Sequence, residues 1–309
     1  MRNPEQWRYN LYKKMNGFKG EYLFMKVLVT GVTGQLGFDV VRELQKRKIT
    51  CQGVSRKEFS LTDETAMRDC ILREKPDAVI HCAAYTAVDK AEDEPELCRA
   101  VNAKATEDLA RICAELGCRM IYISTDYVFE GKGETFYQPA DPKGPQNVYG
   151  RTKLQGEEAV QRLLEKYFIV RISWVFGSNG RNFIKTMLKL SETHEQLTVV
   201  GDQVGSPTYT ADLAVLLADM VQSDHYGVYH ATNEGVCSWA ELAAEVFRQS
   251  GRKTKVTPVG SEAYPVKAVR PKNSRMSKDC LVQAGFQRLP AWQDAVQRYL
   301  QELGVLTAK

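Results

Sequence analysis

Short apolar runs that alternate with longer stretches of helical periodicity are the dominant feature of this sequence. Each run is rich in Val and Ile and lacks polar alternation, which is typical of strands buried on both faces of a parallel sheet. Parallel strands need crossover helices, so the pattern predicts an α/β fold with a Rossmann-like, doubly wound parallel sheet. The runs are KVLVT (26–30), ITCQGVS (49–55), DAVIHCAA (77–84), RMIYIST (119–125) and YFIVRIS (167–173).

The sequence after residue 174 departs from this regular alternation. Its segments are shorter, and four prolines divide residues 258–290 into small pieces. This irregularity predicts a smaller C-terminal α/β lobe rather than further turns of the same sheet. The expected helices are 35–47, 63–74, 95–116, 148–165, 181–193, 211–223, 238–250 and 290–303, with further short strands at 197–200 and 227–232.

The composition is that of a soluble globular protein, with 43% apolar and 26% charged residues in a chain of 309. The net charge is +4, and residues 1–24 supply most of it, with five basic side chains against two acidic ones. The near-neutral remainder argues against a nucleic-acid or membrane partner. No apolar run reaches the roughly 18 residues that a membrane span requires. We therefore expect a cytoplasmic protein.

The cysteines and histidines show no metal-binding pattern. The eight cysteines include no Cys-x-x-Cys pair, and the four histidines have no ligand spacing. We expect free thiols in a reducing compartment and no bound metal. Residues 1–24 lack the pattern of a signal peptide. We expect them to be either an N-terminal extension without fixed structure or the result of a start assigned upstream of the true one, and we favour the second because Met25 directly opens the first strand.

A glycine-rich turn, TGVTGQLG (30–37), joins the first strand to the first helix. Glycines at 31, 34 and 37 allow a tight turn and the close approach of a pyrophosphate, whose charge then lies at the helix N-terminus. A turn needed only for packing would have the same glycines, but the position in the first β-turn-α unit favours a dinucleotide. We expect a dinucleotide-binding domain (25–174 plus about 208–232) and a substrate-binding lobe (about 175–207 plus 233–309).

The residues after the second strand bear on which nicotinamide dinucleotide is bound. An acidic side chain there would hydrogen-bond the ribose 2′-OH of NAD, whereas cations suit the 2′-phosphate of NADP. The sequence VSRKEF (54–59) places Ser55, Arg56 and Lys57 at this point, which favours NADPH over NADH. Lys57 could equally be a solvated strand end, and Glu58 would weaken the preference if the loop turned another way.

Two polar segments carry the expected chemistry. In NVYGRTK (147–153), Tyr149 and Lys153 lie four residues apart and therefore on one face of a helix. A phenol with a reference pKa of about 10 needs a nearby cation to act as an acid or base near neutrality. The same spacing occurs at Tyr9/Lys13 and Tyr22/Lys26, so the decisive feature is STDYVF (124–129) one strand earlier. There, Ser124 or Thr125 can hydrogen-bond a carbonyl at the ligand-binding end of the sheet.

These segments resemble the extended short-chain dehydrogenase/reductases. HCAAYTAVDKAEDEP (81–95), RISWVFG (171–177), VVGDQVGSPTYTADLA (199–214) and RPKNSRMS (270–277) extend the resemblance from about Met25 to the C-terminus. Within that superfamily the chain is most similar to the dTDP-4-dehydrorhamnose reductases. The resemblance implies NADPH-dependent reduction, with NADH possible, of the C4 ketone of dTDP-4-dehydro-L-rhamnose to dTDP-L-rhamnose. It also implies a monomer or homodimer.

The resemblance implies a role for each matching residue. Tyr149 would protonate the sugar O4, Lys153 would lower the pKa of Tyr149 and hold the nicotinamide ribose, and Thr125 would hydrogen-bond the reacting oxygen. Expected cofactor contacts, with the strand-two residues included, are Gly31, Gly34, Gln35, Leu36, Gly37, Ser55, Arg56, Ala83, Ala84, Thr86, Tyr149 and Lys153. Expected substrate contacts are Thr125, Asp126, Tyr127, Trp174, Asn182 and Arg270.

Several alternatives stay open at this point. Trp174 could be a core residue at a strand end, and Arg270 a solvated loop residue. The fold also serves non-catalytic proteins, such as the regulatory β subunit of methionine adenosyltransferase. Sugar-nucleotide epimerases and dehydratases share the tyrosine and lysine. The dehydratases usually carry an acidic pair beside the central Thr, whereas Tyr127 follows Asp126 here.

Overall fold

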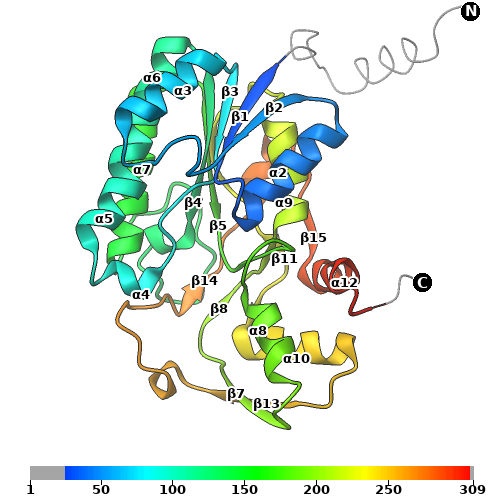
Figure 1. Cartoon of the computed structure of the whole chain (residues 1–309). Helices are drawn as coiled ribbons and strands as arrows, with labels where there is room; N and C mark the ends of the chain where they lie inside the picture. Colours follow the sequence, from blue (N-terminus) through cyan, green and yellow to red (C-terminus); the bar gives the residue numbers. More distant parts are fainter. Residues whose placement is uncertain (1–24, 307–309) are drawn as a thin grey trace, which may run out of the picture.

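The structure is a computed structural model in which residues 25–306 are described. The expectations for residues 1–24, including the Tyr9/Lys13 and Tyr22/Lys26 pairs, lie outside this range. A six-stranded, wholly parallel sheet forms the centre of the molecule, in the order β2-β1-β3-β4-β5-β10 (Figure 1). Its strands are β1 (Lys26–Thr30), β2 (Thr50–Val54), β3 (Ala78–His81), β4 (Arg119–Thr125), β5 (Tyr167–Ile172) and β10 (Gly227–His230).

Helices cover both faces of this sheet, because successive strand residues are apolar and point in opposite directions. Val27 and Val29 belong to the core under α2 and α9, whereas Leu28 belongs to the core under α3, α6 and α7. The doubly wound α/β prediction is confirmed. The covering helices are α2 (Gln35–Lys46) and α9 (Thr210–Met220) on one face, and α3 (Glu64–Glu74), α6 (Ala105–Leu116) and α7 (Val148–Leu163) on the other.

The order of strands defines where a ligand should bind. The chain runs outward from β1 to β2 on one side and from β3 onward on the other, so the topological switch point lies between β1 and β3. Open α/β sheets bind ligands at the carboxyl ends of the strands at such a point. Beyond β3, the short helices α4 (Val88–Ala91) and α5 (Pro95–Arg99) and a π-helical turn (Ala100–Lys104) lead into α6. The helix expected at 95–116 is thus continuous, but its central turn is π-helical between two α-helical parts.

The C-terminal lobe lies beyond the carboxyl ends of the sheet strands, at the bottom of Figure 1, and has its own aromatic-rich core. It is built from α8, α10 and α12 with short strands of two to five residues in sheets of two or three. The sequence patterns predicted one of these strands, at 197–200, and did not resolve the others individually. Our division of the chain into two domains stays a prediction. The remaining elements are β6 (Val175–Phe176), α8 (Phe183–Leu190), β7 (Gln196–Val200), β8 (Val204–Gly205), β9 (Thr208–Tyr209), β11 (Asn233–Glu234), β12 (Cys237–Ser238), α10 (Trp239–Ser250), β13 (Lys255–Val259), β14 (Asn273–Ser274), α11 (Asp279–Gln283), β15 (Leu289–Ala291) and α12 (Trp292–Glu302).

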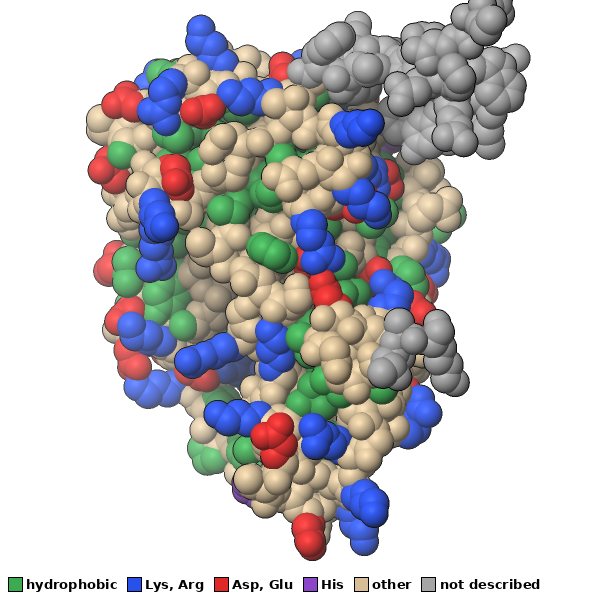
Figure 2. Space-filling view, turned by 45° about the vertical axis from the view of Figure 1, so that its right-hand side comes forward, with side chains coloured by type: hydrophobic (Ala, Val, Ile, Leu, Met, Phe, Trp, Pro, Cys, Tyr) green, Lys and Arg blue, Asp and Glu red, His purple; other side chains and the backbone are tan. Residues whose placement is uncertain are grey.

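The surface carries mixed charge. On the face shown in Figure 2, basic and acidic side chains are interspersed rather than gathered into one field. Within residues 25–306, no helix is long and apolar enough to cross a membrane. No group of three or more His, Cys, Asp or Glu side chains in the same range could hold a metal ion.

Candidate active site

The glycine turn after β1 packs tightly against the end of β3. Gly31 has a φ of +72°, and a Cβ atom there would lie 2.7 Å from the backbone nitrogen of Ala83. A Cβ atom on Gly37 would lie 2.4 Å from the carbonyl oxygen of Gly31. Glycine is therefore required at both positions. Gly34 is the N-cap of α2 and offers no side-chain cap, so the positive end of this helix suits an anion such as a pyrophosphate.

A segment of the lobe holds this turn from the other side. The Asn179 amide donates to the carbonyl oxygens of Thr33 and Gly34, at 2.9 and 3.1 Å. The Asn182 amide donates to the Gln35 side-chain oxygen at 2.9 Å. The turn therefore has fixed geometry, and together with the glycine cradle it fits the diphosphate of a dinucleotide. Leu36, the next predicted contact, is buried beneath the turn.

The end of β3 supplies the next predicted cofactor contacts. The Ala83 backbone N–H donates to the Thr30 hydroxyl at 3.2 Å, which ties the strand end to the glycine turn. Ala84 is half-buried and Thr86 is exposed. Sequence reasoning missed Asn102, whose side chain exchanges hydrogen bonds with the backbone of Tyr85. A buried amide on an otherwise apolar helix face was the available signal.

The end of β2 differs from the cation-rich site that the sequence favoured. The Glu58 carboxylate accepts hydrogen bonds from the Ser55 backbone N–H at 2.6 Å and from the Ser55 hydroxyl at 2.8 Å. These bonds lower the pKa of Glu58. Arg56 and Lys57 are exposed beside it. An acidic group thus occupies the strand end beside the glycine turn, the place where a ribose 2′-OH is usually bound.

The helix α7 carries the predicted catalytic pair and begins as the sequence suggests. The Asn147 side chain accepts from the Gly150 backbone N–H at 2.7 Å and caps the helix. The Glu92 carboxylate accepts from the Val148 backbone N–H at 2.7 Å. Gly150 lets the helix approach the end of β4 closely, because a Cβ atom there would lie 2.3 Å from the Tyr127 carbonyl oxygen. The first turn is therefore held at the end of β4.

Lys153 is buried, with 2% of its surface exposed, under the end of the sheet. Its ammonium donates to the Ile123 carbonyl oxygen at 2.7 Å and lies 3.9 Å from the centre of the Tyr122 ring. Burial lowers the pKa of Lys153 to about 7, and the Glu157 carboxylate opposes this shift. The lysine therefore changes its charge near neutral pH.

Thr125 and Tyr149 lie close enough for the Thr125 side chain to affect the Tyr149 phenol. Burial raises the pKa of Tyr149, while Thr125 opposes the increase. Lys153 is not among the groups that shift this pKa, so its expected lowering of the Tyr149 pKa stays a prediction. A protonated phenol is nevertheless the form that a proton donor needs.

Asp126 and Tyr127 follow directly on a short 3-10 turn. Burial raises the pKa of Asp126 to about 6, although hydroxyl groups of Ser274 and Thr125 donate to its carboxylate. The Tyr127 ring meets the Tyr149 ring edge-on, with centres 5.5 Å apart. These two predicted substrate residues thus border the catalytic tyrosine.

Arg270 is anchored rather than solvated. Its guanidinium donates to the Tyr127 hydroxyl at 3.1 Å and to the Asp89 carboxylate at 2.5 Å. This contact bridges the lobe, the end of β4 and α4 across 143 and 181 residues of sequence. Arg270 therefore lies beside Tyr127, whose ring meets that of Tyr149, and its contact with the substrate stays a prediction.

The other two predicted substrate residues lie differently. Trp174 has a φ of +51°, which is unusual for a bulky residue, and its ring stacks on Trp239 at 3.9 Å. The Asn182 side chain is fully engaged: it donates to Gln35, to the Gly177 carbonyl and to the Tyr299 hydroxyl, and it caps α8 through Lys185 N–H. The structure therefore places Asn182 at the glycine turn, where it has a structural role.

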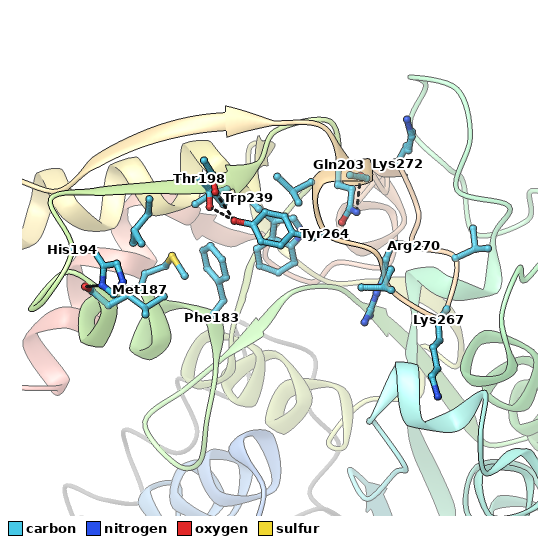
Figure 3. Close-up of a pocket in the computed structure, with 18 of the residues that line it drawn as sticks. Phe183, Met187, His194, Thr198, Gln203, Trp239, Tyr264, Lys267, Arg270 and Lys272 are labelled. Atoms are coloured by element: carbon cyan, nitrogen blue, oxygen red, sulfur yellow. Dashed lines mark hydrogen bonds between the residues drawn. The ribbon is translucent and has the colours of Figure 1, made fainter.

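A cleft of about 980 Å³ opens in the lobe next to these residues (Figure 3). The Tyr264 ring reaches into it, and its hydroxyl bonds the Thr198 hydroxyl at 2.6 Å. Lys267 and Arg270 lie at the end nearer to α4 and α5. Sequence patterns do not reveal this cleft, because its walls come from short segments that are far apart in the chain. Its lining includes Phe183, Met187, Leu197, Gln203, Trp239, Tyr264, Val266, Lys267, Arg270 and Lys272.

A phosphate-binding turn at the switch point, with a Thr, Tyr and buried Lys at the end of the fourth strand, defines an NAD(P)-dependent oxidoreductase of the extended short-chain dehydrogenase/reductase class. The family described as "RmlD substrate binding domain" matches residues 25–305. The chain therefore belongs to that family.

Known proteins resemble the chain over almost their full length. It is 40% identical to a dTDP-4-dehydrorhamnose reductase of Streptomyces griseus, covering 87% of this chain and 91% of the relative. It is 39% identical to the spore coat polysaccharide biosynthesis protein SpsK of Bacillus subtilis, covering 90% and 97%. The crystal structure of a dTDP-4-dehydrorhamnose reductase from Bacillus anthracis, in complex with NADP, superposes with a TM-score of 0.88 at 38% identity, covering 90% and 99%.

Proposed function

We propose that this protein reduces the C4 ketone of dTDP-4-dehydro-L-rhamnose to dTDP-L-rhamnose, with NADPH as the hydride donor and NADH as a possible alternative. The observation that carries the proposal is that Thr125 and Tyr149 lie together at the carboxyl end of β4, with the buried Lys153 one turn further along α7. Relatives named for this reaction, and one solved in complex with NADP, support it. The product would serve the synthesis of a cell-surface polysaccharide in the cytoplasm.

The bound dinucleotide would supply a hydride to C4 of the sugar. Gly31, Gly34 and Gly37 would admit its diphosphate at the N-terminus of α2. Lys153 would hold the nicotinamide ribose. Tyr149, protonated in its buried position, would give its phenolic proton to O4 as negative charge develops there.

The remaining contacts would orient the sugar nucleotide. Thr125 would hydrogen-bond O4 and keep it within reach of the Tyr149 hydroxyl. Asp126 and Tyr127 would contact the sugar, and Trp174 would pack against it. Arg270 would make a charge-assisted bond to the diphosphate, for which it must share its interaction with Asp89.

A non-catalytic regulatory role is the second hypothesis. It requires only the fold and a docking surface, so it gives no reason for a buried lysine or for a tyrosine next to a threonine at the carboxyl end of β4. No observation on the described residues favours it over catalysis. We also propose that the protein acts as a monomer or homodimer.

The test is incubation of the purified protein with dTDP-4-dehydro-L-rhamnose and NADPH. We expect the nicotinamide absorbance to fall in proportion to protein concentration, and NMR to identify dTDP-L-rhamnose. Absence of turnover with this sugar, together with normal NADPH binding, would redirect the search to other sugar nucleotides. Absence of both would favour the regulatory hypothesis.

A further inference from the structure

A buried ion pair lies one helical turn beyond the catalytic lysine. The Glu157 carboxylate on α7 accepts two bonds from the Arg171 guanidinium on β5, at 2.8 and 2.6 Å. Both side chains are 2% exposed. The Ser124 hydroxyl donates a third bond to Glu157 at 2.5 Å. A carboxylate can be held without water only when its oxygens are satisfied in this way.

The three partners of α7 on β4 are consecutive residues. Ile123 accepts the bond from Lys153, Ser124 donates to Glu157, and Thr125 lies next to Tyr149. The helix residues 149, 153 and 157 lie at intervals of four, on one face of α7. Glu157 is therefore the third of three side chains that attach this face to the end of β4, and the one not assigned a role above.

The ion pair is in turn fixed to the sheet. Arg171 pairs in register with Ser124 on β4 and with His230 on β10, so the three side chains form a row across three neighbouring strands. The remaining Arg171 donor, Nη1, reaches the Pro139 carbonyl at 2.9 Å and lies 3.4 Å from His230 Nε2. Burial and the Arg171 charge lower the pKa of His230 to about 3, so this histidine is neutral.

We propose that Glu157, held by Arg171, is a positioning residue: it fixes the register of α7 on the end of β4 and supplies the negative charge that faces the Lys153 ammonium. Replacing a buried ion pair by apolar residues is often neutral or stabilising, so stability alone is a weak reason for its presence. This inference rests on the proposed function for its kinetic part only.

The charged and titratable groups around the pair are few. Burial lowers the pKa of His81 to about 3 and raises that of Cys82 to about 12, so both are neutral beside Lys153. The pKa values of Cys98, Tyr122 and Tyr149 are also raised by burial. Among the groups that act on the Lys153 ammonium, Glu157 is the carboxylate and therefore supplies the negative charge. On its far side, Glu157 faces Arg171 and Lys143.

The test compares Glu157→Gln with Glu158→Gln, which removes an exposed charge from the next position of α7. Loss of the Glu157 charge leaves Arg171 unopposed near Lys153 and should favour the neutral amine. NADPH binding, followed by fluorescence without sugar, should weaken as the pH rises and Lys153 loses its charge. We expect the pH midpoint of this loss to lie about one unit lower in Glu157→Gln than in the wild type. Glu158→Gln should match the wild type. An unchanged midpoint in Glu157→Gln overturns the electrostatic part of the proposal.

The register part is tested by Glu157→Asp, which keeps the charge but cannot reach all three partners. We expect its pH midpoint to match the wild type while kcat falls about tenfold with little change in KM. Wild-type kcat in this variant overturns the positioning role. If Glu157→Asp does not fold, Arg171→Lys provides the same comparison, with the midpoint retained and kcat reduced. Failure of the wild type to turn over the sugar would overturn the proposed function and leave the cofactor-binding midpoints interpretable.

Discussion

The Lys153 ammonium donates a hydrogen bond to the Ile123 carbonyl oxygen at 2.7 Å, in a site from which solvent is excluded. The carbonyl is one residue before Ser124 and two before Thr125, so the lysine is fixed to the strand that presents the reacting oxygen's partner. Burial at this position lowers the pKa of Lys153 to about 7, well below its ordinary value of 10.5.

Lys153→Met should therefore separate function from stability. We expect turnover to fall at least ~100-fold, because the cofactor ribose and the phenol lose their cation. Since the folded-state pKa lies below the unfolded value, the folded protein is penalised fully below about pH 7, and the penalty disappears as pH rises toward 10.5. Urea unfolding should show the variant gaining most relative to wild type below pH 7. If the difference in unfolding free energy between the variant and the wild type did not change with pH, the assignment of a buried charge to Lys153 would be contradicted.

Glu58→Gln should shift the cofactor preference. The Glu58 carboxylate sits on Ser55 at the end of β2 and would repel a 2′-phosphate while accepting a bond from a 2′-OH. We expect the ratio of NADPH to NADH affinity to rise about tenfold, roughly 1.4 kcal/mol. Isothermal titration with both dinucleotides measures it. Asp69→Asn, an exposed acid on α3, is the matched control. An unchanged ratio in Glu58→Gln would show that the ribose lies elsewhere.

Ser274→Ala should move the acid limb of the pH profile. The Ser274 hydroxyl stabilises the Asp126 carboxylate, so its loss raises the Asp126 pKa above the present value of about 6. Less carboxylate is then present near neutrality, and the acid limb of kcat/KM should shift to higher pH. Ser277→Ala, whose hydroxyl donates to Asp279 in the same segment, should leave the limb in place. Identical limbs in both variants would remove Asp126 from the substrate site.

Asn182→Ala should act on stability more than on substrate binding. Its side chain caps α8 and bonds Gln35 and Tyr299, so we expect a loss of about 1–2 kcal/mol in unfolding free energy. The KM for the sugar nucleotide should change less than twofold, while NADPH binding weakens because the glycine turn loses a support. A stable variant with a greatly raised sugar KM would instead restore Asn182 to the substrate site.

The fold and the catalytic centre were predictable because each follows from local patterns with fixed geometry. Apolar strands without polar alternation indicate a sheet that is covered on both faces. Open α/β sheets bind ligands at the carboxyl ends of their strands, which is where Thr125 meets the first turn of α7. The spacing of Tyr149 and Lys153 needed only helical periodicity. These features require no knowledge of how distant segments meet.

The features that escaped prediction depend on such meetings. Arg270 bonds Asp89, which is 181 residues away in the sequence, and no local sequence pattern predicts that contact. The lobe contains strands of two residues, too short to show any period. Glu58 turns onto Ser55 through a tight local loop, which adds a carboxylate to the two cations expected at the end of β2. The pKa of Tyr149 rises because burial, invisible in spacing, outweighs its neighbours.

Turnover of dTDP-4-dehydro-L-rhamnose by Tyr149→Phe tests the central claim, that Tyr149 protonates O4. The substitution removes only the phenolic hydroxyl, so we expect kcat to fall about 100- to 10,000-fold while NADPH still binds. Tyr167→Phe, at the start of β5, is the control and should keep wild-type kcat. A Tyr149→Phe protein that retains more than about a tenth of wild-type kcat would contradict the assignment of Tyr149 as the proton donor.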